Sequence, residues 1–180
     1  MISQEHALRA LFHELVDNCY RGDLRVDDAE ISSYMGDLLT DFSESEKIYA
    51  IRDSIGRPVK ELSAMLEAAD PIHGSAPSFD AERQARKHIG DYALFFTGMY
   101  PESMHPILQP QSFTRLIETG KESYAIVASF DLFEYAREAP LFERLAAQFE
   151  TCVAGLNLVR AELDKRRALP FSPKPQKHLM

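Results

Sequence analysis

Seven apolar residues in the last third of the chain alternate at spacings of three and four residues, which is a strict heptad repeat. A helix with this spacing presents one continuous apolar seam, and it needs a neighbour to cover that seam. Pro140 fits the first turn of such a helix, where its missing N–H costs nothing. We therefore expect a long helix from Pro140 to residue 168, with a seam formed by Phe142, Leu145, Phe149, Cys152, Leu156, Val159 and Leu163.

Amphipathic periodicity and capping residues predict further helices along most of the chain. Ser3 and Gly22 bracket the first of them, and the residues from Ser43 to Glu46 form a capping box. The expected helices cover residues 4–21, 28–42, 43–55, 58–69, 80–100, 112–119 and 122–138.

The segment over residues 122–138 is ambiguous. Tyr124, Ile126 and Phe130 alternate as in a β-strand, but no turn signal follows them. The next residues continue with helical spacing, so we expect a helix. Gly120 either ends the preceding helix or is only a weak point in one longer helix.

The helix over residues 80–100 loses its polar side after Tyr92, which indicates a central position among other helices. Together these patterns predict an all-α, single-domain, irregular bundle of seven or eight helices over residues 1–168. Residues 169–180 contain three prolines and no periodicity. We therefore expect a flexible, Pro-rich C-terminal tail that folding does not require.

Charge, hydropathy and cysteine positions indicate where the protein is located and which partners it does not bind. The formal net charge is −8 and the cations are scattered among acids, so we expect no nucleic-acid binding. The longest uninterrupted apolar run, Tyr92 to Phe96, is too short to span a membrane. Cys19 and Cys152 both fall on apolar sides of expected helices, as free cysteines in a reducing compartment do. With no signal-peptide pattern at the N-terminus, these features predict a cytoplasmic location.

Local motifs for catalysis and cofactor binding are absent from the sequence. There is no phosphate-binding glycine loop, no nucleophile elbow and no zinc-protease motif. The Glu-x-x-His spacing from Glu102 to His105 lies between Pro101 and Pro106, so both side chains cannot come from one helical face. We therefore predict no catalytic residue, no metal site and no cofactor.

Polar residues inside otherwise apolar helices give one candidate ligand pocket. The candidate residues are His88, Asp91 and Tyr92 in the helix over residues 80–100, and Tyr124, Asp131 and Tyr135 in the helix over residues 122–138. Within each helix the three side chains share one side. If the two sides face each other, they form either a pocket with shifted pKa values or a satisfied polar network that holds two helices in register.

Two functional hypotheses remain. The favoured one is a non-catalytic helical protein that acts through a protein partner or through self-association, because catalytic motifs are absent and a heptad seam can bind a second helix. The alternative is a small-molecule-binding or enzymatic bundle that uses the buried His, Asp and Tyr side chains.

Overall fold

The computed structural model describes residues 3–53, 55–72, 74, 76, 78–100 and 110–168. This part of the chain contains eight α-helices and no β-strand, which confirms the all-α prediction. The helices are α1 (Gln4–Asp17), a π-helix η1 (Asn18–Asp23), α2 (Ala29–Asp41), α3 (Ser45–Ile48), α4 (Leu62–Ala69), α5 (Phe79–Met99), α7 (Pro110–Ser129), a 3₁₀ helix η2 (Phe133–Tyr135), α8 (Ala139–Ala147) and α9 (Phe149–Ala168). The predicted flexible tail over residues 169–180 and the Glu102–His105 motif lie outside the described residues.

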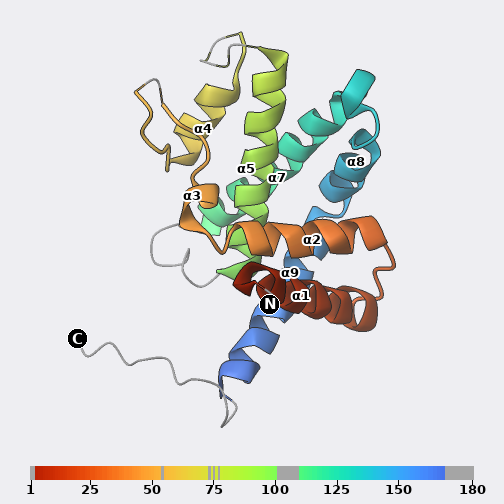
Figure 1. Ribbon diagram of the computed structural model, residues 1–180. Coiled ribbons are helices and arrows are strands. Elements are labelled where there is room, and N and C mark those ends of the chain that lie inside the picture. The colour runs from red at the N-terminus through yellow and green to blue at the C-terminus, as the bar shows by residue number, and fades with distance from the viewer. Residues whose placement is uncertain are drawn as a thin grey trace, which may run out of the picture.

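Helix α5 occupies the middle of the molecule, as its apolar second half predicts. It packs against α7, α9 and α4, and α1 and α2 lie side by side across its C-terminal part (Figure 1). The main core joins buried side chains from α1, α2, α5, α7, α8 and α9, while a smaller cluster joins α4 to α5 around Met65 and Ile89. None of the helices in the described ranges is long and apolar enough to cross a membrane.

The heptad seam is buried inside the chain itself. Its first six residues are almost completely buried, and Leu163 packs against the edge of the core. The prediction of one long helix is nevertheless wrong, because Gln148 leaves helical geometry (φ −109°, ψ 24°) and divides the segment into α8 and α9. The neighbours that cover the seam therefore come from the same chain, and the seam leaves no exposed strip for a second copy.

The two helices expected over residues 43–55 and 58–69 are both present in shortened form, as α3 and as α4 (Leu62–Ala69), with a turn between them. Helix α3 ends at Ile48, and Arg52 forms an isolated antiparallel bridge with Pro58. The carboxylate of Asp53 accepts hydrogen bonds from the backbone N–H groups of Ile55 and Arg57. Aspartate favours turns through such bonds, and here this local preference overrides the apolar periodicity.

The segments around Gly120 also differ from expectation. Residues 110–129 form the single helix α7, which includes Gly120. The packing requires glycine at this position, because a Cβ there would overlap the Phe149 ring. The predicted helix over residues 122–138 is wrong beyond Ser129, where the chain continues as a loop, the 3₁₀ helix η2 and a turn. Phe133 has a left-handed backbone conformation (φ 56°), which an α-helix cannot include.

Gly155 gives a first prediction, because the Tyr20 ring lies directly against it on α9. The Tyr20 hydroxyl donates to the Cys152 carbonyl oxygen at 2.5 Å, so the ring cannot move away without breaking a buried hydrogen bond. We expect Gly155→Ala to lower the free energy of unfolding by about 1–3 kcal/mol, as overpacked cores do. Gly22→Ala is the matched control, because a Cβ at Gly22 meets no atom within 4 Å. Urea unfolding of both variants measures the difference, and equal stabilities would contradict the packing.

Candidate functional site

The buried carboxylate of Asp91 is the centre of the polar cluster on α5. Its Oδ1 accepts hydrogen bonds from the Tyr34 hydroxyl of α2 at 2.5 Å and from the Tyr124 hydroxyl of α7 at 2.6 Å. Its Oδ2 lies 3.2 Å from the Nζ atom of Lys87, one turn earlier on α5. The cluster thus joins three helices through one carboxylate.

Glycine brings Tyr124 close enough to reach this carboxylate. Gly90 precedes Asp91 on α5, and a Cβ at Gly90 would overlap the Tyr124 ring. The ring therefore lies directly on the α5 backbone, between the rings of Phe142 and Phe149 (centroid distances 5.7 and 5.9 Å). The apolar packing fixes the position of the Tyr124 ring, and its hydroxyl donates a hydrogen bond to the Asp91 carboxylate.

The electrostatics of the cluster keep both phenols protonated. Burial, followed by the negative charge of Asp91, raises the pKa of Tyr34 and of Tyr124 well above the ordinary value. Each phenol therefore remains a hydrogen-bond donor at physiological pH. Because the two phenols and the Lys87 ammonium all bind Asp91, its two oxygens are satisfied within the protein.

His88 lies beside this cluster but does not complete it. The imidazole packs against the Phe42 ring (centroid distance 5.9 Å), and its buried Nε2 atom has no hydrogen-bond partner in the described part of the chain. Burial lowers the pKa of His88, an effect that the charge of Asp91 and a hydrogen bond to the Ile48 backbone oppose. A neutral imidazole in this position can pack in the core without the cost of a buried charge.

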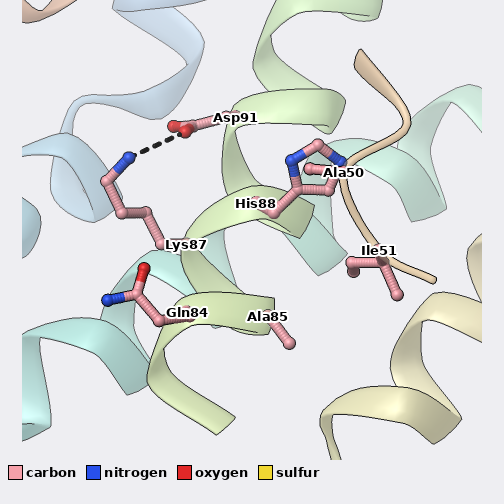
Figure 2. Close-up of a pocket in the computed structure, with 7 residues that line it drawn as sticks. All are labelled: Ala50, Ile51, Gln84, Ala85, Lys87, His88 and Asp91. Atoms are coloured by element: carbon pink, nitrogen blue, oxygen red, sulfur yellow. Dashed lines mark hydrogen bonds and ion pairs between the residues drawn. The ribbon is translucent and has the colours of Figure 1, made fainter. Parts of the chain in front are cut away.

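A pocket of about 320 Å³ lies between α5 and the segment that follows α3. Figure 2 shows Lys87 and Asp91 paired along α5, and the His88 ring beside Ala50. The pocket is lined by Ala50, Ile51, Gln84, Ala85, Lys87, His88 and Asp91. Its charged groups are already paired with each other, so they offer a ligand little unused hydrogen-bonding capacity.

The structure brings together only part of the predicted pocket. Tyr124 reaches Asp91, but Tyr92 packs against the Phe96 ring at 4.6 Å between centroids. Asp131 is exposed, and the Tyr135 hydroxyl donates a hydrogen bond to the Asp80 carboxylate at the start of α5. The side that Tyr124, Asp131 and Tyr135 were expected to share does not exist, because the helix ends before Asp131.

Sequence reasoning missed two members of the cluster. The i, i+4 spacing of Lys87 and Asp91 is visible in the sequence and could have identified Lys87. Tyr34 had no such signal, because its contact with Asp91 depends on how α2 packs across α5.

A second feature lies at the end of the molecule where α5 begins. Besides the Tyr135–Asp80 hydrogen bond, the Arg83 guanidinium lies over the Tyr135 ring at 4.2 Å and binds Glu138 through an Nη2–Oε2 contact of 2.8 Å. These contacts hold the segment after α7 against the N-terminal end of α5 (Figure 1).

Large apolar side chains project into solvent from both segments. The exposed fractions are 71% for Phe79, 67% for Leu132 and 92% for Phe133. We call Phe79, Leu132, Phe133 and Tyr135 the aromatic tip. Residues 79–83 and 130–138 carry five carboxylates against two guanidinium groups, so the aromatic tip is surrounded by an excess of negative charge.

Comparisons with known proteins found no match. No protein-family model, no curated protein and no solved structure matches this chain. Within the described ranges, no three His, Cys, Asp or Glu side chains lie close enough together to hold a metal ion. What the geometry defines is an all-α bundle with a buried carboxylate–phenol cluster and an exposed aromatic tip.

The lowered pKa of His88 predicts a loss of stability in acid. As the pH falls below the ordinary value of 6.5, the unfolded chain binds a proton at this residue while the folded chain stays neutral. The free energy of unfolding should therefore decrease until the pH reaches the lower pKa of the folded state, and no further below it. Urea unfolding at several pH values should show a shallower decrease for His88→Gln than for the parent. His6→Gln is the control, because His6 is exposed, and a decrease unchanged in His88→Gln would contradict the assignment.

Proposed function

We propose that this protein is a non-catalytic, cytoplasmic helical module that binds another protein chain through the aromatic tip. The proposal rests on the conformation of Phe133, whose side chain has an exposed fraction of 92% and whose backbone is left-handed. A bulky residue in that conformation costs about 1–2 kcal/mol relative to ordinary backbone. An exposed aromatic side chain held at such a cost, next to exposed Leu132 in a segment that packs against the start of α5, where Phe79 is also exposed, is typical of a binding surface.

The buried cluster supports the alternative function less well. An acid–base site needs a group that can exchange a proton with a substrate, but Tyr34 and Tyr124 hold their protons and Asp91 accepts from both. The unpartnered Nε2 of His88 is buried rather than exposed to the pocket. These contacts favour the interpretation that the cluster holds α2, α5 and α7 together. Cys19 and Cys152 are free and buried, in keeping with a reducing compartment.

Site-specific photo-crosslinking tests the proposal in cells that express the protein. A photoreactive phenylalanine replaces Phe133 in one variant and Tyr100, an exposed aromatic residue at the other end of α5, in the control. We expect a defined protein chain to be crosslinked at position 133 and not at position 100.

The crosslinked chain is then purified and its affinity measured directly. Phe133→Ser should weaken binding by about tenfold or more, as the loss of a central aromatic contact does. Equal affinities for the parent and for Phe133→Ser would contradict the proposal.

A further inference from the structure

We infer that the aromatic tip binds the Pro- and Lys-rich segment 169–180 of a second copy of this chain. The inference rests on the proposed function and names the partner that the aromatic tip accepts. Association would then run head to tail, from the aromatic tip of one copy to the C-terminal segment of the next.

The chemistry of the aromatic tip selects the class of ligand. The exposed rings of Phe79 and Phe133 provide flat apolar surfaces, and proline-rich segments bind to surfaces of this kind because their extended conformation is already restricted. The excess of carboxylates around the rings favours a ligand with positive charge. The aromatic tip should therefore bind an extended, basic segment that contains prolines.

Residues 169–180 of the same chain have this composition. The segment reads LPFSPKPQKHLM, with Pro170, Pro173 and Pro175 interleaved with Lys174 and Lys177. It contains no Asp or Glu, although acids outnumber bases by 28 to 20 in the whole chain. Charge complementarity thus pairs this segment with the acidic end of the bundle.

The position of α9 prevents residues 169–180 from binding the aromatic tip of their own copy. The Arg160 guanidinium of α9 binds the Met99 carbonyl oxygen, which places Arg160 at the C-terminal end of α5. From there α5 extends back to Phe79 over 21 residues, about 32 Å. In the opposite direction α9 continues to Ala168, a further distance of about 12 Å (Figure 1).

The length of the segment decides between one copy and two. Residues 169–180 span at most about 40 Å when fully extended. These twelve residues would be fully extended in reaching the aromatic tip of the same copy, so they could not also lie on it. The segment of a second copy has no such constraint. Because the two surfaces differ, the contact is heterologous, and each added copy again presents one free aromatic tip.

Mixing two full-length variants provides the test. Phe133→Ser removes the most exposed ring of the aromatic tip and keeps the segment, whereas Lys174→Glu with Lys177→Glu reverses the charge of the segment and keeps the aromatic tip. Sedimentation velocity should show concentration-dependent association of the parent and a monomer for each variant alone. An equimolar mixture of the two variants should form a one-to-one heterodimer, because it contains one intact surface of each kind.

Lys47→Glu with Lys165→Glu is the matched control. It changes the net charge by the same amount at two exposed positions outside the segment, and it should leave the association of the parent unchanged. Added salt should weaken association of the parent, since exposed charges are screened.

A parent chain that remains monomeric over a wide concentration range would overturn the inference, as would a mixture that gives no heterodimer. Association that is lost in Phe133→Ser but kept in the segment variant would also overturn it. The proposed function survives each of these outcomes if crosslinking at position 133 captures a different protein.

Discussion

Replacing Leu156 with alanine is expected to lower the free energy of unfolding by about 2–5 kcal/mol, the range for a large-to-small change in a packed core. Leu156 has an exposed fraction of 0% and lies at the contact of α9 with α5, where its side chain packs directly against Gly98. The glycine allows the two helices to approach closely around Leu156, so truncating this side chain leaves a cavity at their contact. Chemical denaturation monitored by circular dichroism measures the loss.

Leu132→Ala is the matched control for this prediction. It is the same chemical change at a residue of the aromatic tip that projects into solvent, so its effect should stay within about 0.5 kcal/mol. A loss under about 1 kcal/mol for Leu156→Ala would mean that the seam of α9 is not covered by its own chain. The head-to-tail contact would then have to compete with association through the seam.

Asp91→Ala is expected to cost about 2–6 kcal/mol, because it leaves two buried hydroxyls without an acceptor, at about 1–3 kcal/mol each. The substitution leaves the buried hydroxyls of Tyr34 and Tyr124 without an acceptor, and it leaves Lys87 without its counter-charge. Three helices lose a shared contact at once. Urea unfolding followed by tyrosine fluorescence, supported by circular dichroism, gives the free energy.

Tyr124→Phe provides the comparison within the cluster. It removes one donor and leaves the carboxylate with the Tyr34 hydroxyl and the Lys87 ammonium, so its cost should be smaller, about 1–3 kcal/mol. A double-mutant cycle of Tyr124→Phe with Asp91→Asn should show coupling between the two sites. Neutral or stabilising effects of Asp91→Ala would contradict a structural role and would favour the small-molecule pocket instead.

The sequence was sufficient to predict which residues form the core and which helix is central. The heptad positions from Phe142 to Val159 are buried, and α5 lies among α4, α7 and α9. Apolar periodicity carries this information because it reflects burial directly. It does not specify where a helix breaks: α8 and α9 share one seam although Gln148 separates them, and the turn at Asp53 depends on side-chain hydrogen bonds.

The candidate site was predictable only within a helix. His88, Asp91 and Lys87 lie on one side of α5 by spacing alone, whereas Tyr124 joined the predicted site only on the condition that the two helix sides face each other. Tyr34 comes from α2, so its contact depends on tertiary packing that no local pattern encodes. Phe133 was missed for a related reason, since a left-handed phenylalanine leaves no signature in the sequence.

The central claim is that the aromatic tip serves binding at a cost in stability. Phe133→Gly tests it directly, because glycine accepts the left-handed backbone while losing the ring. Arg25→Gly is the control, because Arg25 is the other described non-glycine residue with a positive φ. The measurement is the affinity of both variants for the chain crosslinked at position 133, together with their free energies of unfolding. We predict that both variants are as stable as the parent or more stable by up to about 1 kcal/mol, and that only Phe133→Gly loses about tenfold or more in affinity. Equal affinities, or a Phe133→Gly variant that is strongly destabilised, would contradict the account.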